Sequence, residues 1–266
     1  MFSLCRAPSR ILLATTCFCT SLLTTNVAQA ACNPAEDPCA PKKEIGSWDK
    51  SLAFGFNYTS GNSDTSALSL LGRAKRETTE DVIDFDLTSG SGEDRARDTE
   101  TVDAKNKDDF RANANYKYLL GGDWFAGAGW AFLYDDIAQV DYRTSLTPVV
   151  GYYLLKDEDF TLSVDAGPGY TFERVASVDN DFFSPKIGER FDWIISCTSK
   201  IYQKADIFFD TSNSDNYLVN AEAGVESALS TSLSLVFLVR DTYDNEPAVD
   251  REKNDVAMIT AVKVAL

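Results

Sequence analysis

The residue types available for chemistry are limited first by an absence, because the 266 residues include no histidine. Mechanisms that use imidazole as a base, and zinc or haem sites with histidine ligands, are therefore excluded. The nearest pair of carboxylates is Asp135 with Asp136, and two carboxylates can act as an acid and a base. Adjacent residues of a strand or turn usually point apart, however. We therefore expect no catalytic residues, no enzymatic activity and no cofactor.

Two acidic segments carry oxygen ligands of the kind that Ca²⁺ prefers, namely Asp179-Asn180-Asp181 and residues 213–216. Neither has the glycine and the terminal glutamate of an EF-hand loop at the required spacing. Turns in which Asx side chains bind their own backbone explain both segments better, so we expect no metal site. Bridging of lipopolysaccharide by divalent cations at acidic outer loops stays open as an alternative.

The first residues of the chain predict a signal peptide at 1–31. This segment has two arginines, no acidic residue and an apolar stretch at 11–23, and it ends on small residues at Ala28 and Ala30. The apolar stretch is shorter than the ~20 residues that a spanning helix needs, which argues against a transmembrane anchor.

Residues 32–46 are rich in proline and charge, and they predict a periplasmic linker. Cys32 and Cys39 flank a short loop within it. Because an exported chain meets an oxidising compartment, these two cysteines are candidates for a disulfide. Lipidation of Cys32 is the alternative, although the leucine that such a site favours three residues earlier is missing. We expect Cys197 to be a small buried apolar residue.

The composition favours a folded, non-nucleic-acid-binding chain. Hydrophobic residues make up 44% of the sequence, so a packed or lipid-facing structure is expected. Lys and Arg number 25 against 41 Asp and Glu, which gives a net charge of −16. A nucleic-acid partner would need a basic face.

From residue 47 onward the hydrophobic pattern has a period of two, which is typical of strands with one apolar and one polar face. Segment 110–118 is the clearest case, because aromatic residues and alanines there alternate with Arg111, two asparagines and Lys117. About twelve segments follow this pattern, two of them (82–89 and 205–211) more weakly: 51–60, 67–76, 82–89, 110–118, 124–134, 142–154, 162–172, 187–195, 205–211, 217–225, 233–239 and 256–266.

The connections between these segments tend to alternate in length. The even-numbered ones are expected to be short: 77–81, 121–123, 156–159, 200–204 and 230–231. Three odd-numbered ones are long and charged: 91–108, 175–185 and 242–254. Two short odd ones, 61–64 and 213–216, break the rule. Short turns on one side and long loops on the other are typical of bacterial outer-membrane barrels, which also have an even number of strands.

The alternation also fits a soluble barrel or sandwich, so the choice depends on which face carries charge. The polar face carries both signs, in Arg73, Lys75, Arg111, Lys117, Arg143, Arg190, Arg240 and Lys263 and in Asp165, Glu173, Asp192, Glu222 and Glu226. Aromatic residues lie near strand ends on the apolar face, where membrane girdles belong: Trp48, Tyr58, Trp124, Tyr134, Tyr142, Tyr152 and Tyr217.

We therefore predict an all-β fold, a closed antiparallel up-and-down transmembrane β-barrel of about 12 strands spanning residues 47–266. Its apolar side chains face lipid and its charged ones face the lumen. The lumen charge candidates are Arg73, Arg111, Arg143, Asp165, Glu173, Asp192 and Arg240. Pro148 and Pro168 fall inside predicted strands, where each removes a ladder donor, so we expect β-bulges at both.

Several stretches in order along the chain resemble the salt-induced outer membrane protein family (YdiY-like), a domain of unknown function. They are Trp48 and Leu52, Thr59 to Thr65, the Tyr134-Asp135-Asp136 turn with Arg143, Asp165 to Tyr170 with Glu173, and Tyr243-Asp244 with Pro247, Lys253 and Asp255. The resemblance implies an outer-membrane barrel and no catalytic residues. Two departures are the cysteine-flanked linker and the final Leu266, where an aromatic residue is usual.

These observations predict a protein exported to the cell outer membrane. We expect a narrow passive or gated pore, and the acidic charge favours cations if the lumen is open. The alternative is a non-conducting structural barrel, or one that binds a ligand or lipopolysaccharide. The expected partners are the lipid bilayer, lipopolysaccharide and the barrel assembly machinery.

Overall fold

The computed structural model describes residues 45–60, 65–94, 104–213, 215–248 and 251–266. The predicted signal peptide at 1–31, nearly all of the predicted linker at 32–46, and the cysteines Cys32 and Cys39 lie outside these residues. Predictions about those segments therefore stay predictions.

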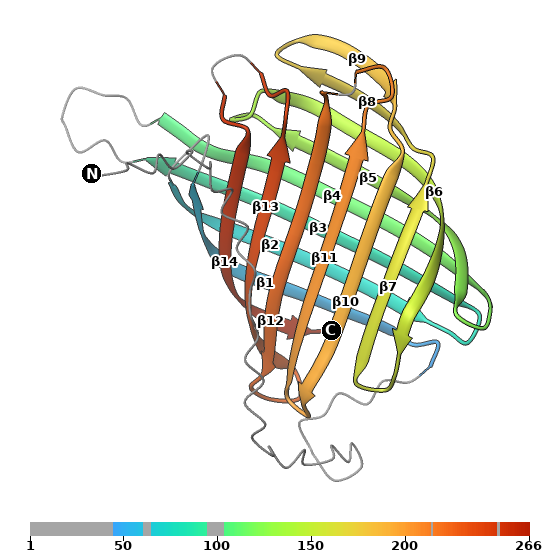
Figure 1. Ribbon diagram of the computed structural model, residues 1–266. Helices are drawn as coiled ribbons and strands as arrows, with labels where there is room; N and C mark the ends of the chain where they lie inside the picture. The colour runs from blue at the N-terminus through green and yellow to red at the C-terminus, as the bar shows by residue number, and fades with distance from the viewer. Residues whose placement is uncertain (1–44, 61–64, 95–103, 214, 249–250) are drawn as a thin grey trace, which may run out of the picture. The chain divides into compact units, whose positions relative to one another are not determined.

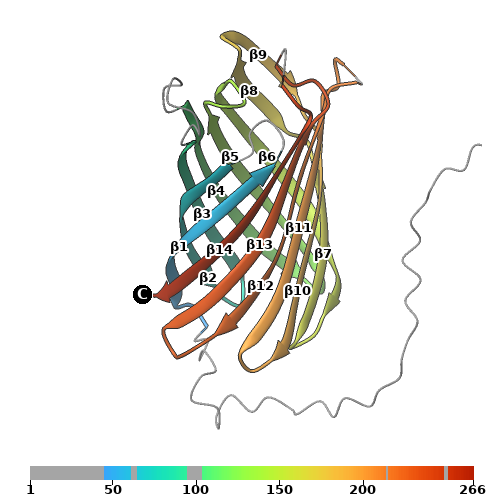
Figure 2. The same cartoon turned by 90° about the vertical axis from the view of Figure 1, so that its left-hand side faces the viewer.

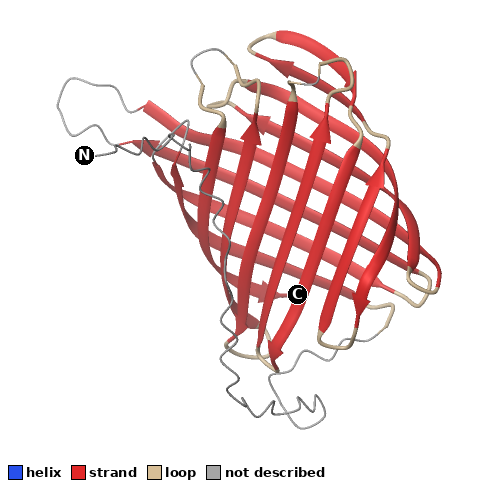
Figure 3. Cartoon of the chain, viewed as in Figure 1, coloured by secondary structure: helices blue, strands red, loops and turns tan. Residues whose placement is uncertain are grey.

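The described residues form strands joined by turns (Figures 1 and 3). The strands are β1 (Trp48–Ser60), β2 (Thr65–Glu77), β3 (Asp81–Asp94), β4 (Ala104–Gly121), β5 (Trp124–Asp135), β6 (Val140–Lys156), β7 (Phe160–Gly167), β8 (Tyr170–Val175), β9 (Val178–Phe183), β10 (Lys186–Ser196), β11 (Ser199–Phe209), β12 (Tyr217–Ala228), β13 (Leu233–Asp244) and β14 (Asn254–Ala265). No helix among the described residues is long and apolar enough to cross a membrane.

The strands make one antiparallel sheet that closes on itself. Chain neighbours pair with one another except at β7–β8 and at β9–β10, where β6 pairs with both β7 and β8, and β7 pairs with β10. β1 pairs with β14, and the pairing of β5 with β6 completes the circle. Figure 2 shows the strands tilted and wrapped around a common axis. Closure removes the exposed edge along most of the wall, which is a requirement for any sheet in hydrocarbon.

Two of the barrel strands are each interrupted once. β7 pairs with β10, and β8 pairs with β9. The register of the first pair continues without a shift into the second, since Gly167 lies opposite Lys186 and Tyr170 lies opposite Phe183. The pair β7–β8 is therefore one strand with a break at Pro168-Gly169, and β9–β10 is one strand with a break at Ser184-Pro185. The fourteen segments thus form a closed barrel of twelve strands, which confirms the predicted fold class.

Three prolines coincide at these interruptions. The registers place Pro168 level with Pro148 of β6 on one side and with Pro185 on the other. The predicted bulges are wrong, because β6 pairs with β5 through Pro148 without a register shift there, and the strand at Pro168 is interrupted instead. The missing N–H groups are accommodated by a gap in the ladder, without an inserted residue.

Most large apolar side chains of the described strands face outward and most polar ones face inward, as predicted. On β2, Leu68 is 73% exposed while its neighbour Ser69 is 5% exposed. On β8, Thr171 is 1% exposed and Phe172 is 49% exposed. Exposed large apolar residues and buried polar residues are the reverse of a soluble protein, so the exposed surface of this barrel suits lipid.

Several predicted connections belong to strands. The third, 91–108, is shorter than expected, because β3 and β4 stay paired as far as Asp94 and Ala104. The eighth, 200–204, lies wholly inside β11, and the actual turn is Cys197-Thr198. Strands pair through their backbones, which does not require an apolar residue at every second position. Charged strand ends therefore lack the alternating pattern, and the sequence predicts them as loops.

The seventh connection, predicted as a long loop at 175–185, is instead the hairpin β8–β9. Its turn is Ala176-Ser177, with positive φ values of 49° and 65°. Two central residues with positive φ match the right-handed twist of a two-residue hairpin. The usual Asn-Gly or Asp-Gly signal is absent, which is why the sequence pattern missed it.

Cys197, the one cysteine among the described residues, is disulfide-bonded. The expectation that it is only a small buried apolar residue is therefore wrong. It lies in the turn between β10 and β11.

Candidate pore interior

The barrel interior contains ion pairs set up by the strand register. Arg73 is paired with Asp86 across β2 and β3, Arg143 with Glu173 across β6 and β8, and Glu222 with both Arg240 and Lys204 across its two neighbouring strands. Residues directly opposite one another in a sheet have side chains close enough to interact. The alternation that puts charge on one face therefore also puts opposite charges in contact.

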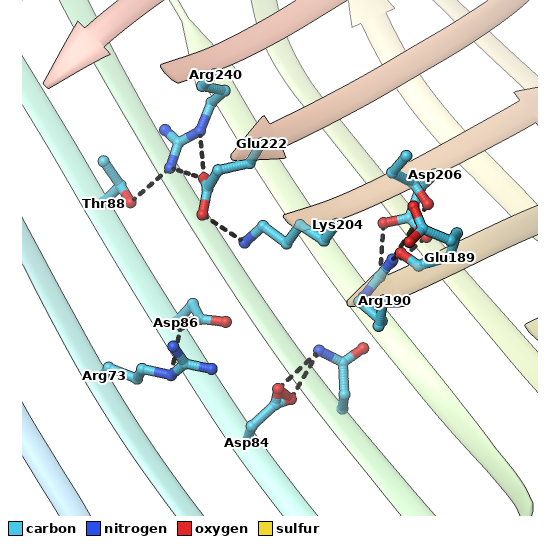
Figure 4. A network of polar contacts seen from close by, with 12 residues as sticks. Arg73, Asp84, Asp86, Thr88, Glu189, Arg190, Lys204, Asp206, Glu222 and Arg240 are labelled. Atoms are coloured by element: carbon cyan, nitrogen blue, oxygen red, sulfur yellow. Dashed lines mark hydrogen bonds and ion pairs between the residues drawn. The ribbon is translucent and has the colours of Figure 1, made fainter. Parts of the chain in front are cut away.

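Glu222 of β12 forms ion pairs with two basic side chains. Arg240 Nε and Nη2 donate to Glu222 Oε2 at 3.0 and 2.8 Å, and Lys204 Nζ lies 3.2 Å from Glu222 Oε1 (Figure 4). The Glu222 side chain is only 8% exposed. One carboxylate thus contacts two cations, one with each of its oxygens, and the three side chains together carry a single positive charge.

A second network lies on β7, β10 and β11. Lys186 Nζ lies 2.9 Å from Asp165 Oδ1 and 2.9 Å from Asp206 Oδ1. Arg190 Nη2 donates to both oxygens of Asp206, at 2.9 and 2.7 Å (Figure 4). The network holds two cations and two carboxylates, so it carries no net charge.

Three further contacts join β13 to strands that are not its neighbours. Arg240 Nη2 donates to Thr88 Oγ1 of β3 at 3.4 Å, and Thr242 Oγ1 accepts from Arg111 Nη1 of β4 at 3.4 Å. Arg143 Nη2 of β6 donates to the Asp244 carboxylate at 3.0 Å. Several strands separate β13 from each of these partners in the closed sheet. The contacts therefore cross the lumen.

The crossing arginines are also held at their own wall. Arg143 Nε donates to Glu173 Oε2 at 2.5 Å, and Arg111 Nε lies 3.6 Å from Asp109 Oδ2. Each of these three arginines, which we call the arginine forks, thus contacts a carboxylate at its own wall and a second side chain on the opposite side of the lumen. This arrangement fixes the arginine positions and closes space that a wide channel would leave open.

An apolar cluster fills another part of the interior. Ala53, Val236, Leu238, Ile259 and Ala261 are buried together on β1, β13 and β14, with Leu71 of β2 packed against them. Leu238 and Ile259 pair directly, next to the pair of Arg240 with Ala257. An apolar patch thus lies beside the charged layer on this part of the wall.

Lys117 has an aromatic neighbour in the interior. Its Nζ lies 4.6 Å from the ring centroid of Phe125, a cation–π contact. The Phe125 ring is fully buried because it covers Gly151, where a Cβ would lie 2.1 Å from the ring. Glycine at this position is what lets the ring lie flat against the wall.

The predicted lumen residues lie as follows. Arg73, Arg111, Arg143, Asp165, Glu173 and Arg240 all make the ion pairs described above. Asp192 lies opposite Tyr202, and it makes no ion pair with any described residue. Sequence reasoning missed Lys186, Lys204, Asp206 and Asp244. Lys204 lies in the segment 200–204 that the sequence predicts as a loop, and Asp206 lies in a weakly patterned segment, whereas alternation along β11 places both on its inward face.

The interior wall pairs its basic side chains with acidic ones. Among the residues whose side chains the structure describes, inward basic side chains other than Lys117 each have an acidic partner: Arg73 with Asp86, Lys75 with Glu77, Arg111 with Asp109, Arg143 with Glu173, Lys186 with Asp165, Arg190 with Asp206, Lys200 with Glu226, Lys204 and Arg240 with Glu222, and Lys263 with Glu226. Because Glu222 and Glu226 each serve two cations, these pairs carry no negative charge in sum, and the net charge of −16 is carried outside them.

A family model described as "Protein of unknown function, DUF481" matches residues 52–265, nearly the whole barrel. The chain belongs to this family. No curated protein matches the DUF481 chain in sequence.

Two solved structures show the same fold as this DUF481 barrel. The NanC porin is 9% identical with a TM-score of 0.53, over 81% of this chain and 100% of that one. An outer membrane channel from Pseudomonas putida F1 is 10% identical with a TM-score of 0.51, over 87% of this chain and 99% of that one. Identity this low shows the fold alone, which is that of an outer-membrane β-barrel of the porin kind.

Proposed function

We propose that this DUF481 protein is a narrow outer-membrane pore, passive or gated, that prefers cations. The observation that carries the proposal is the set of arginine contacts crossing from β13 to β3, β4 and β6 inside a barrel with an apolar exterior. Charged side chains that line a barrel interior are the groups with which channels attract and select small ions.

The pore is narrow because the side chains that line it are nearly buried. The Arg143 side chain is 13% exposed and Arg240 is 15% exposed, although both face the interior. Twelve strands enclose more space than the side-chain-filled eight-stranded barrels and less than a large porin. Opening requires the arginine forks to release their far partners, which gives a physical basis for gating.

Cation preference is proposed from the turns at one mouth of the barrel, since the ion pairs of the lumen carry no negative charge in sum. The charged described residues between and beside the strand ends there are mostly acidic: Asp135, Asp136, Asp141, Asp179, Asp181, Asp210, Asp215, Glu246 and Glu252, against Arg174, Arg251 and Lys253. An acidic mouth raises the local concentration of cations.

The names of the two similar structures, a porin and an outer membrane channel, support a conducting barrel. They also support residence in the outer membrane, with the bilayer, lipopolysaccharide and the barrel assembly machinery as partners. We also propose that the chain belongs to the salt-induced group that its sequence resembles. Catalysis is not proposed, because most interior carboxylates are held in ion pairs and the sequence contains no histidine.

A non-conducting barrel that binds a ligand or lipopolysaccharide is the second candidate. The observation in its favour is the apolar cluster around Leu238 and Ile259, which fills part of the lumen beside the arginine layer. In that case the same crossing contacts would act as a permanent plug.

Planar-bilayer recording of the refolded full chain tests the proposal. Small unitary currents with a reversal potential on the cation side are expected under a salt gradient. Arg240→Ala should enlarge them, since it removes one crossing contact, whereas Arg174→Ala on the outer hairpin should not. Anion preference would overturn the selectivity. Silence of both the wild type and Arg240→Ala would favour the second candidate.

A further inference from the structure

The outward face of the barrel carries a feature that the pore does not use, a hydrogen-bonded polar pair of Glu189 on β10 and Gln203 on β11. Gln203 Nε2 donates to Glu189 Oε2 at 3.1 Å. Both side chains face outward, because they alternate along their strands with the inward Arg190 and Lys204. A carboxylate and an amide are thus displayed toward lipid.

The pair lies well inside the apolar belt and away from its borders. Gln203 is opposite Ala223 of β12, which lies about midway between Tyr217 and Ser227 on that strand. A membrane strand crosses the hydrocarbon in about 9–11 residues, so both borders are several residues away. Lipid headgroups and water are at those borders, out of reach of these two side chains.

Hydrocarbon offers neither a donor nor an acceptor, so a polar group facing it is costly unless protein satisfies it. The bond between Gln203 and Glu189 uses one amide N–H and one carboxylate oxygen. Among the described residues, no partner is present for Glu189 Oε1 or for Gln203 Oε1. The pair therefore presents both a donor and an acceptor at the lipid-facing surface.

Small residues lie beside the pair on the β12 side, whereas on the other side Val164 of β7 lies opposite Glu189 and Phe191 of β10 lies opposite Gln203. Ala205 lies opposite Ala221, and Gln203 lies opposite Ala223, all on the outward face of β11 and β12. Elsewhere the belt is built from large side chains such as Phe237 and Leu235 on β13, which are 46% and 42% exposed. Small side chains let another membrane segment approach closely, and polar groups then bond across the contact.

We propose that this polar patch, Glu189, Gln203, Ala205, Ala221 and Ala223, is the interface through which two copies of this chain associate in the membrane. A twofold axis brings the same patch of each copy together. The remaining N–H of Gln203 in one copy then donates to the partner's Glu189, and the reverse bond forms by symmetry. A second copy is favoured over a lipid, because an acyl chain has no matching donor or acceptor.

The test measures self-association of the refolded full chain in lipid vesicles, by energy transfer between two labelled populations as the protein-to-lipid ratio is varied. The wild type should dimerise. The double variant Glu189→Leu with Gln203→Leu should associate at least tenfold more weakly. Glu189→Gln should still associate, since two amides are self-complementary. Thr260→Val, which removes an outward hydroxyl on β14, is the matched control and should behave as wild type.

A photo-crosslinking residue at Ala205, with Glu189 and Gln203 intact, keeps the proposal testable if the leucine variant does not fold. A product of twice the monomer mass supports it. A wild type that stays monomeric at high protein-to-lipid ratio, or a cross-link to lipid or lipopolysaccharide only, overturns it. None of these readouts depends on whether the pore conducts.

Discussion

Replacement of Glu222 by glutamine tests the paired interior most sharply. The change keeps the shape of the side chain and removes only its charge. Arg240 and Lys204 then face a neutral amide at the distances where they now meet a carboxylate, 2.8 Å and 3.2 Å. Both cations lose their anionic partner, and at least one of the three present contacts must be lost, because the amide nitrogen cannot accept a hydrogen bond.

The structure sets the size of the effect. Breaking a buried ion pair by removing one partner costs about 3–5 kcal/mol. The low end applies here, because the Lys204 side chain is 32% exposed and can be rehydrated while Arg240 is only 15% exposed. We therefore expect Glu222→Gln to lower the free energy of unfolding by about 3 kcal/mol.

Equilibrium unfolding in guanidinium chloride from lipid vesicles, followed by tryptophan fluorescence, measures this change. Asp215→Asn, in the exposed turn before β12, is the matched control and should change stability by no more than about 0.5 kcal/mol. In Glu222→Gln, the interior loses a negative charge and keeps its cations, so the reversal potential measured in planar bilayers should move toward anions. A loss of stability below about 1 kcal/mol, together with unchanged selectivity, would refute the account of the interior.

Three further outcomes are expected. Gly151→Ala should destabilise by about 1–3 kcal/mol in the same unfolding assay, because the added Cβ would lie 2.1 Å from the nearest ring carbon; Gly72→Ala, with 3.6 Å to the nearest atom, should be tolerated. Cys197 should resist maleimide labelling of the unfolded chain until a reductant is added, since it is disulfide-bonded. Burial alone would raise the pKa of Asp210, but hydrogen bonds from Ser212 lower it below its usual range. The stability that Asp210 adds is thus present above the ordinary aspartate pKa and is lost as the pH falls through the lower folded value. The advantage of wild type over Asp210→Asn should accordingly shrink only in strong acid.

The strands and their two faces were predictable because the side-chain period of two is a property of the strand itself. Leu68 and Ser69 differ in exposure in the way their alternation implies, and the same rule placed the aromatic residues outside. The central inference, apolar outside and charged inside, needed no knowledge of which strands pair. It is a local pattern repeated along the chain.

Features that depend on pairing were not predictable. Arg143 and Asp244 are 101 residues apart in the sequence and meet only because the barrel closes. The alignment of Pro148, Pro168 and Pro185 likewise exists only in the register of three strands. The Ala176-Ser177 turn adopts positive φ without glycine, so its local sequence does not predict a two-residue turn.

The outward Glu189 shows a different limit. Alternation along β10 assigns it to the apolar face, where a carboxylate breaks the pattern. Nothing within the strand explains the exception, because the explanation we propose involves a second molecule. Departures from a strong local pattern are where function is most usefully sought.

Spin labels placed singly along β13, from Leu233 to Arg240, test the central claim most directly. Collision with oxygen, which dissolves in lipid, and with a water-soluble nickel complex is measured at each position in vesicles. Oxygen accessibility should be high at Leu235, Phe237 and Val239 and low at the intervening inward positions. Equal accessibility at both sets, or nickel accessibility at the outward set, would contradict a barrel with its apolar face in lipid and its charges inside.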